Sequence, residues 1–488
     1  MSHPMGTGGS TSDPRETVTS EPTHVVGVGA SAGGLEALEQ FFGNVPAKTG
    51  MCFVVIQHLS PDYKSLMVEL LGKRAAMSIR LAEDGIELEA DTTYVIPPGK
   101  DITVTGLRLN VTDQVQQRTP HLPVDRFLIS LAHEMANRSI AVILSGTGSD
   151  GARGVREVKS AGGMIIVQTS ESAKFDGMPT SAADTGLADY VLAPDQMGPK
   201  LVDYVARAHD EPVDESETLL SDEETKLRIF ARIRERHKVD FTYYRMSTVL
   251  RRIQRRMGIT RVSSVSEYAR LLDEDSTEVD TLYRELLIGV TGFFRDREAF
   301  EHLAAYWKKR LADTPETSEI RCWVAGCSTG EEAYSVVITL LEAVREARSS
   351  AMVKVFATDI DQNALAKAAA GRYPESITAD VDHDLLVRYF VRKNQDFQVT
   401  RGVRERVVFA QHNLVHDPPF TNIDLVSCRN LLIYLQPVLQ RRVLEHLNFS
   451  LSPGGILFLG SSETIGDMLD YYEPLNHKWK IYRSRGSR

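Results

Sequence analysis

Short apolar runs alternate with amphipathic segments of helical period over most of the chain, and this alternation is the strongest constraint on its fold. The apolar runs of the first stretch lie near 24–29, 51–57, 140–145 and 163–168, and its helical patterns near 35–43, 62–72, 124–137 and 151–161. From residue 319 onward, apolar runs and helical patterns alternate again. Alternation of this kind predicts a mostly parallel sheet covered by helices on both faces. We therefore predict an α/β protein with two doubly wound, Rossmann-like domains.

The 488 residues are enough for several domains. The predicted units, in order, are a disordered tail (1–22), an α/β domain (23–208), an acidic linker (209–221), an all-helical module (222–315) and a second α/β domain (316–488). The linker is inferred from its density of Asp and Glu. We expect hairpins over 78–116 and a small β insertion near 374–408, where FQVTRGVRERVVF alternates like a hairpin.

Composition excludes several classes of protein. No apolar run approaches the roughly 18 residues that a membrane span requires, and the N-terminus lacks the pattern of a signal peptide. The four cysteines have no C-x-x-C spacing, so we expect neither disulfides nor a metal site. The net charge of −10 argues against a nucleic-acid partner. These features predict a cytoplasmic protein without direct membrane insertion.

The first domain opens with VVGVGASAGG, an apolar strand followed by a glycine-rich turn and a helical pattern. Such a turn either binds a phosphate at the helix N-terminus or presents a serine nucleophile in the form G-x-S-x-G, here Ser31. A dinucleotide site requires a carboxylate about 20 residues further on, at the end of the next strand. The next strand ends instead at His58, which is suited to take a proton from Ser31.

A general base needs a partner that fixes its orientation, and Asp150 follows the buried strand of AVILSGTGSDG. We therefore predict a triad of Ser31, His58 and Asp150 at the carboxyl edge of the sheet. Simpler roles stay open for each residue: a turn serine, a hydrogen-bonded surface histidine and a helix cap.

Residues 24–198 resemble the catalytic domain of the chemotaxis protein-glutamate methylesterase, CheB, through GASAGG, VVIQHLSPDY, YVIPPG, LSGTGSDGARG and FDGMPTSA. The resemblance implies hydrolysis of glutamate γ-methyl esters and, in many members, deamidation of glutamines. It assigns Ser31 as nucleophile, His58 as general base and Asp150 as its orienting partner. It also implies an oxyanion hole from the backbone N–H of Ala32 and the turn at Thr147.

A second glycine-rich turn lies in CWVAGCSTGEEAYS, and here the next strand ends in Asp359. A carboxylate at this point is placed to bind a ribose hydroxyl, so this turn predicts a cofactor site. Glu331 and Glu332 disfavour a phosphate and favour a cationic ligand such as a sulfonium. Their alternative role is to complement the dipole of the helix that they begin.

Residues 222–486 resemble the chemotaxis receptor methyltransferase, CheR, which uses S-adenosylmethionine, through LLIGVTGFFRD, AGCSTGEEAYS, FATDID and DLVSCRNLLIY. The cofactor contacts that this resemblance implies are Thr291, Arg295, Glu331, Asp359, Asn413, Leu414, Arg429 and Asn430. Arg295 and Tyr434 are expected closest to the transferred methyl and the acceptor carboxylate. Gly289 stands where the family often has Asn.

A basic stripe, Arg251, Arg252, Arg255 and Arg256, lies at helical spacing in this acidic chain. It is either a solvated face or a docking surface for the acidic helices of a receptor. If it docks a receptor, replacing the four arginines with Glu should reduce receptor methylation and leave cofactor affinity intact. The favoured function is a fused methylesterase and methyltransferase acting on the cytoplasmic domains of chemoreceptors. The alternative is a signalling scaffold with one or both catalytic sites inactive.

Overall fold

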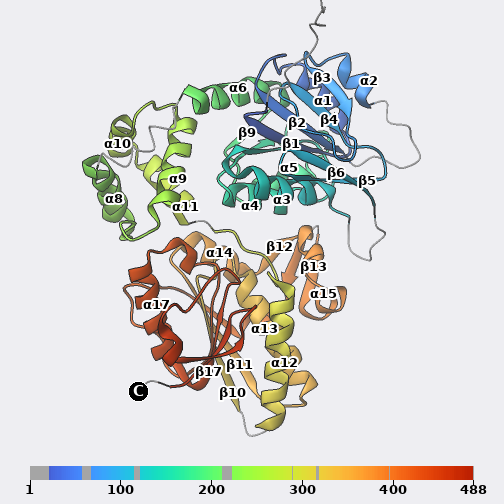
Figure 1. Cartoon of the computed structure of the whole chain (residues 1–488). Helices are drawn as coiled ribbons and strands as arrows, with labels where there is room; N and C mark the ends of the chain where they lie inside the picture. The colour runs from blue at the N-terminus through green and yellow to red at the C-terminus, as the bar shows by residue number, and fades with distance from the viewer. Residues whose placement is uncertain are drawn as a thin grey trace, which may run out of the picture.

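The computed structural model describes residues 21–57, 67–114, 121–210, 223–287, 289–314, 318–394 and 396–486. Two α/β units lie one above the other in Figure 1, and a group of helices lies beside them. Most of the predicted tail and most of the predicted linker lie outside the described residues. Within the described part of the chain, no helix is long and apolar enough to cross a membrane.

The first unit contains a seven-stranded sheet of order β3-β4-β2-β1-β7-β8-β9 in which every neighbouring pair is parallel. Its strands are β1 (His24–Ala30), β2 (Met51–Gln57), β3 (Ser78–Leu81), β4 (Thr92–Val95), β7 (Ser139–Ile143), β8 (Met164–Gln168) and β9 (Tyr190–Leu192). Its helices are α1 (Gly34–Phe42), α2 (Met67–Gly72), α3 (Pro123–Met135), α4 (Ala152–Ser160), α5 (Gly177–Ala183) and α6 (Pro194–Asp210). One core packs beneath α3 and α4 and the other beneath α1 and α6, so the doubly wound prediction is confirmed.

Only part of the region from 78 to 116 forms a hairpin. Strands β5 (Lys100–Thr105) and β6 (Arg108–Asp113) pair antiparallel, as expected. The expectation is wrong for β3 and β4, which extend the main sheet as parallel strands. The polar residues between these two strands gave no helical signal, and a hairpin was the simpler interpretation of two short neighbouring runs.

Strand β1 is the middle strand of the sheet, and its residues are therefore buried on both faces. Two glycines in it allow helix α3 to pack closely. A Cβ on Gly27 would lie 2.6 Å from Cδ2 of Leu128, and one on Gly29 would lie 2.4 Å from Cγ1 of Val124. Gly27 and Gly29 of the opening motif therefore allow α3 to pack against β1, the strand that precedes Ser31.

The helical module is confirmed and has its own core. It consists of α8 (Glu223–His237), α9 (Met246–Thr260), α10 (Val265–Glu274) and α11 (Ser276–Leu287), which bury a shared apolar cluster. The next helix, α12 (Arg297–Asp313), packs instead on the second α/β unit through Leu303, Trp307 and Leu311.

The second unit contains a seven-stranded sheet of order β15-β11-β10-β16-β17-β19-β18, parallel except at the two pairs made by β19. Its strands are β10 (Glu319–Ala325), β11 (Met352–Asp359), β15 (Val407–Gln411), β16 (Ile423–Cys428), β17 (Leu451–Leu459), β18 (Tyr472–Asn476) and β19 (Ile481–Ser484). Helices α13 (Glu331–Glu346), α14 (Gln362–Ala370) and α17 (Pro437–Ser450) cover it. This architecture confirms the second doubly wound domain.

The insertion is a three-stranded antiparallel sheet of β12 (Arg372–Pro374), β14 (Asp396–Val399) and β13 (Phe390–Lys393). It differs from the expected hairpin within FQVTRGVRERVVF. That segment is divided by the short helix α16 (Arg401–Arg404), and its second half is β15, a parallel strand at the edge of the main sheet. Alternation of side chains identifies a strand but not the partner with which it pairs.

Candidate active sites

Both candidate sites lie where the order of strands reverses. Strand β1 lies between β2 and β7, and β10 lies between β11 and β16. In open α/β sheets the loops on either side of such a strand separate, so a crevice is expected at the carboxyl ends of the strands. Ser31 follows β1, whereas the second glycine-rich turn follows β10.

Ser31 is held by the loop that follows β7. Its backbone N–H donates to the carbonyl of Ser145 at 3.0 Å, and the hydroxyl of Ser145 donates to the carbonyl of Ala32, also at 3.0 Å. Gly146 packs directly against the nucleophile candidate, because a Cβ at this position would lie 2.9 Å from Cβ of Ser31. The backbone N–H groups of Ala32 and Thr147 donate no hydrogen bond within the described residues. Both are therefore available for an oxyanion.

Asp150 is buried and belongs to the same loop, between β7 and α4. Its two carboxylate oxygens accept hydrogen bonds from the backbone N–H groups of Val124 at 2.9 Å and Asp125 at 2.8 Å. The carboxylate thus caps α3, and not the helix that starts at residue 151 as the simpler sequence interpretation had it. His58, the predicted general base, lies outside the described residues, so the complete triad stays a prediction.

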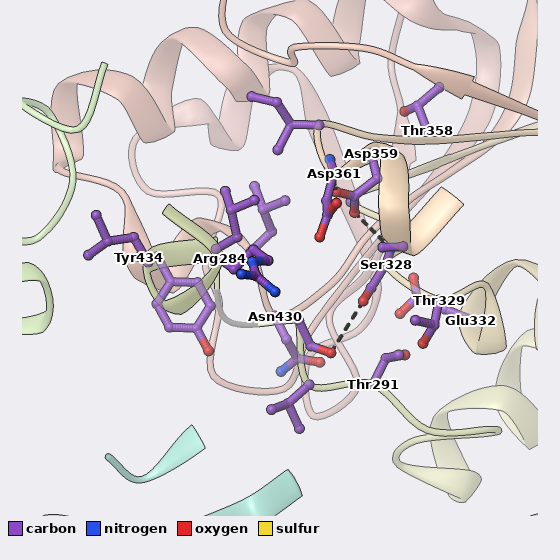
Figure 2. A pocket seen from close by; sticks show the side chains of 18 of the residues that line it. Arg284, Thr291, Ser328, Thr329, Glu332, Thr358, Asp359, Asp361, Asn430 and Tyr434 are labelled. Carbon is purple, nitrogen blue, oxygen red and sulfur yellow. Dashed lines mark hydrogen bonds between the residues drawn. The ribbon is translucent and has the colours of Figure 1, made fainter. Parts of the chain in front are cut away.

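The second crevice contains a cavity of about 580 Å³, within the range of sites for small molecules and cofactors. The predicted residues that line it are Thr291, Arg295, Asp359, Asn413, Leu414, Arg429, Asn430 and Tyr434. Figure 2 shows Asp359 and Asp361 at one end of the cavity and Tyr434 at the other.

Asp359 is the last residue of β11, and its carboxylate connects the glycine-rich turn after β10 to the turn after β11. One carboxylate oxygen accepts from the N–H of Ser328 at 2.7 Å, and the other accepts from the N–H of Asp361 at 2.9 Å. Ser328 has a positive φ of 47° and its hydroxyl donates to the carbonyl of Gly289. Burial raises the pKa of Asp359, and these backbone hydrogen bonds oppose that shift. The carboxylate is therefore oriented toward the cavity before any ligand binds.

The structure separates the two adjacent glutamates that begin α13. Glu332 lines the cavity, and one of its oxygens accepts from the hydroxyl of Ser427 at 2.6 Å. Burial raises the pKa of its carboxyl, and the nearby Arg429 guanidinium opposes this shift. Glu331, the predicted contact, is not part of the cavity wall and lies 3.3 Å from Arg156 of the first α/β unit. Two neighbours on a helix face different directions, so sequence alone could not choose between them.

Arg429 is part of the cavity wall and is hydrogen-bonded to the loop that contains Arg295. Its Nη2 donates to the carbonyl of Arg295 at 3.0 Å and to Asp296 at 2.7 Å. The guanidinium also lies over the ring of Phe458, at 4.6 Å from the ring centre. Nε and Nη1 of Arg429 and Oδ1 of Asn430 are buried without a hydrogen-bond partner in the described structure. Unsatisfied buried groups of this kind fit a polar ligand in the cavity.

The first α/β unit contributes part of the cavity wall, which the sequence did not predict. Thr185, Gly186 and Leu187 line the same cavity as Asp359 and Tyr434. Nearby, Nζ of Lys367 donates to the carbonyl of Asp184 at 3.3 Å. No motif marks these residues, because their role depends only on how the two units dock.

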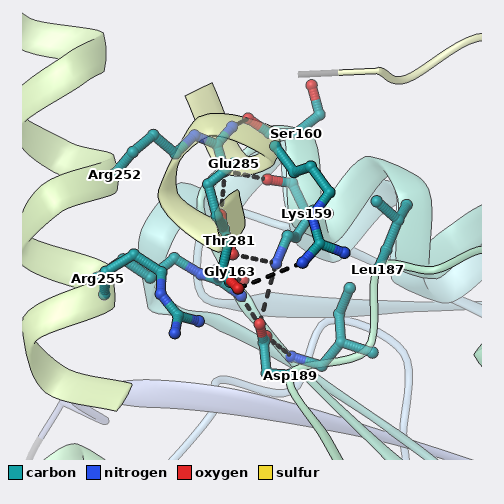
Figure 3. A network of polar contacts seen from close by, with 12 residues as sticks. Lys159, Ser160, Gly163, Leu187, Asp189, Arg252, Arg255, Thr281 and Glu285 are labelled. Carbon is teal, nitrogen blue, oxygen red and sulfur yellow. Dashed lines mark hydrogen bonds and ion pairs between the residues drawn. The ribbon is translucent and has the colours of Figure 1, made fainter. Parts of the chain in front are cut away.

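The basic stripe of α9 is not an exposed face. Only Arg251 is exposed; Arg252, Arg255 and Arg256 are buried. Arg252 donates to the carbonyls of Lys159 at 2.7 Å and Ser160 at 2.9 Å in the first unit, as Figure 3 shows. Arg256 pairs with Glu278 inside the helical module. The expectation of a receptor-docking stripe is therefore wrong for this arrangement, since the chain's own residues occupy it.

Family models match three segments of the chain. Residues 26–201 match the CheB methylesterase family, residues 227–287 match the all-alpha domain of CheR methyltransferase, and residues 289–481 match its SAM-binding domain. The last match identifies S-adenosylmethionine as the cofactor of the second crevice, in agreement with the polar groups that line it.

Individual relatives agree with this division. An uncharacterized 104.1 kDa protein of Rhodobacter capsulatus is 38% identical over 440 residues, which are 86% of this chain and 46% of that protein. Chemotaxis protein methyltransferase 2 of Pseudomonas aeruginosa is 34% identical over 44% of this chain and 77% of its own length. A protein-glutamate methylesterase/protein-glutamine glutaminase of Desulfitobacterium hafniense is 32% identical over 40% of this chain and 51% of its own length. The chain thus spans about half of the first and third of these relatives.

Proposed function

The chain belongs to the CheR methyltransferase family and joins to it a CheB methylesterase domain, and from this premise we propose that one polypeptide both removes and adds methyl groups on glutamate side chains. Its substrates are the cytoplasmic domains of chemoreceptors or related signalling proteins, and it works in the cytoplasm without inserting into the membrane. The observation that carries the proposal is that two groups of polar residues lie at separate sheets: Ser31 and Asp150 follow β1 and β7 in the first unit, and the cavity around Asp359 lies in the second.

In the methylesterase domain, Ser31 is the proposed nucleophile and attacks the carbonyl carbon of the methyl ester. The N–H groups of Ala32 and Thr147 are the proposed donors to the oxyanion. His58 takes the hydroxyl proton and delivers it to the leaving methanol, and Asp150 orients the imidazole. Water then hydrolyses the acyl-enzyme and releases the glutamate. The same chemistry on a glutamine side chain releases ammonia.

In the methyltransferase domain, the bound cofactor supplies a methyl group on a sulfonium. We propose that Asp359 binds the ribose hydroxyls and that Glu332 stabilises the cationic end of the cofactor. Arg295 orients the acceptor carboxylate, and Tyr434 covers the reacting centre. Because the acceptor is already ionised at neutral pH, no general base is required. The residues act by positioning the two partners and excluding water.

A pair of assays on the intact chain tests the proposal. Calorimetric titration with S-adenosylhomocysteine measures the second site, and methanol release from N-acetyl-glutamate γ-methyl ester measures the first. We expect Ser31→Ala to abolish hydrolysis and leave the titration unchanged, and Asp359→Ala to do the reverse. Absence of both S-adenosylhomocysteine binding and Ser31-dependent hydrolysis in the wild-type chain would favour the scaffold alternative.

A further inference from the structure

A groove of about 300 Å³ separates the methylesterase domain from the methyltransferase domain. Helix α4 supplies one wall, and the loop from Val290 to Arg297 supplies the other. Val290, Thr291 and Arg295 line both this groove and the cofactor cavity, so the two spaces adjoin at the loop. A group in the groove would therefore lie next to a ligand in the cofactor cavity.

Two guanidinium groups from different domains meet at this loop. Nη1 of Arg295 donates to the carbonyl of Val290 at 3.4 Å, and Nη1 of Arg156 donates to the carbonyl of the next residue, Thr291, at 3.1 Å. Nη1 of Arg156 also lies 3.3 Å from Glu331. The remaining N–H groups of both guanidiniums make no hydrogen bond with any described residue. Each retains donors that can bind an anion.

The other charges of the groove are largely paired. Arg153 pairs with Asp380 at 2.8 Å, and Arg297 pairs with Asp382 at 2.6 Å. Asp296 is engaged by Arg429. Glu157 adds one carboxylate, so the groove walls hold four arginines and three acidic residues. Arg156 and Arg295 are therefore the residues of the groove whose remaining N–H groups are placed to bind a carboxylate.

We propose that this groove binds the side chain of the acceptor glutamate, and that Arg156 of the methylesterase domain is a positioning residue for methyl transfer beside Arg295. The proposal rests on the methyltransferase function proposed above. With the carboxylate held by both guanidiniums, one oxygen forms a bond to the methyl carbon as the carbon–sulfur bond breaks. The electron pair of that bond goes to sulfur, S-adenosylhomocysteine leaves, and no proton moves. The acceptor site is then complete only when the two domains are docked.

Two analogues of S-adenosylhomocysteine test this site without any receptor. Each has nitrogen in place of sulfur and a short alkyl arm, which ends in a carboxylate in one and a carboxamide in the other. We expect the wild-type chain to bind the carboxylate about tenfold more tightly, the equivalent of one charge-assisted hydrogen bond. Arg156→Ala should abolish most of this preference, and Arg156→Lys should restore part of it.

Three controls keep the result interpretable. Ester hydrolysis should be unchanged in Arg156→Ala, because Arg156 lies outside the proposed methylesterase site. Because Arg156 donates to the carbonyl of Thr291, a predicted cofactor contact, affinity for S-adenosylhomocysteine is measured in each variant, and the carboxylate preference is taken as the ratio of the two analogue affinities. Arg138→Ala, at a partly exposed arginine of the same domain that pairs with Glu21, should keep the carboxylate preference. An unchanged preference in Arg156→Ala, or none in the wild type, would overturn the groove assignment alone. Failure of the wild type to bind S-adenosylhomocysteine would overturn the methyltransferase function as well.

Discussion

Asp125 and Asp150 each cap the helix that begins beside the other. Asp150 precedes α4 but accepts from two N–H groups in the first turn of α3. Asp125 lies in that turn and accepts from the N–H groups of Arg153 at 2.9 Å and Gly154 at 2.7 Å in α4. Its second oxygen is buried without a hydrogen-bond partner in the described structure. These reciprocal hydrogen bonds connect α3 to α4, and one of the two capping residues is Asp150, the proposed catalytic aspartate.

This arrangement predicts an unusual pH dependence of stability. Burial, and the neighbouring carboxylate of Asp150, raise the pKa of Asp125 from 3.8 to about 8. Between these values the native state keeps a proton that the unfolded chain has lost, so the free energy of unfolding falls as pH rises. The slope expected from this one proton is about 1.4 kcal/mol per pH unit.

Asp125→Asn tests this dependence because it retains the accepting oxygen and removes the titration. Urea unfolding at pH 5, 7 and 9 should show that the variant loses less stability than the wild type as pH rises. Asp113→Asn, at an exposed aspartate paired with Lys100, is the control and should follow the wild type. Parallel curves for Asp125→Asn and the wild type would contradict the shifted pKa.

Gly146→Ala should inactivate the methylesterase site without affecting methyl-donor binding. Its Cβ would lie 2.1 Å from Sδ of Met178 and 2.9 Å from Cβ of Ser31, so the nucleophile must move. A displacement of about 1 Å lowers turnover on the order of 100-fold. Methanol release measures the effect. Gly148→Ala, in the same loop, meets no atom within 4 Å, so it should keep hydrolysis and lose only some stability from its φ of +80°.

Glu332 and Glu331 should differ in their effect on cofactor affinity. Glu332→Gln removes a charge from the cavity wall, so we expect it to weaken binding of the cationic S-adenosylmethionine more than binding of neutral-sulfur S-adenosylhomocysteine. Glu331 lies against Arg156 and not in the cavity wall. Glu331→Gln should therefore keep the affinity for each ligand within about twofold of the wild-type value, a difference of only a few tenths of a kcal/mol in binding free energy. Calorimetry with the two ligands measures this. Equal losses in the two variants would show that Glu331 also contacts the cofactor.

The sequence predicted the parts of the molecule that depend on local pattern. Apolar strands followed by glycine-rich turns lie in the interior of both sheets, as expected, and Asp359 at the end of its strand lines the cavity. Side-chain direction was harder to predict, because adjacent positions such as Glu331 and Glu332 satisfy the same motif. The strand at 407–411 was assigned to a hairpin because alternation does not identify a pairing partner.

Contacts between the domains could not be predicted from local pattern. The arginines of α9 formed a charged stripe in the sequence, but their partners are remote: Asp189 is 66 residues from Arg255, and Glu285 is 30 residues from it. A stripe of charge indicates that a helix face needs polar partners and does not say whether they come from water, a receptor or the same chain. Here burial of Arg252 and Arg255 resolves the alternatives.

Glu285→Gln should loosen the docking of the two domains. Glu285 accepts from Arg255 at 2.5 Å and from Lys159 of the methylesterase domain at 2.6 Å, and Arg255 also pairs with Asp189 (Figure 3). Although burial opposes its ionisation, the charges of Arg255 and Lys159 lower the pKa of Glu285 to about 2. Its contribution is therefore present above the ordinary pKa of 4.5 and is lost as pH falls toward 2.

The substitution leaves Arg255 and Lys159 with Asp189 as their one remaining carboxylate, and breaking a buried pair of this kind typically costs about 3–5 kcal/mol. Hydrogen exchange measures the result. Backbone amides of α4 and α9 should exchange faster in Glu285→Gln than in the wild type at pH 7. After correction for intrinsic exchange, the wild type should approach the rates of the variant only in strong acid. Asp280→Asn lies on the same helix but pairs with Arg236 inside the helical module, so it should leave α4 unaffected. Unchanged exchange in α4 of Glu285→Gln would mean that other contacts hold the domains together.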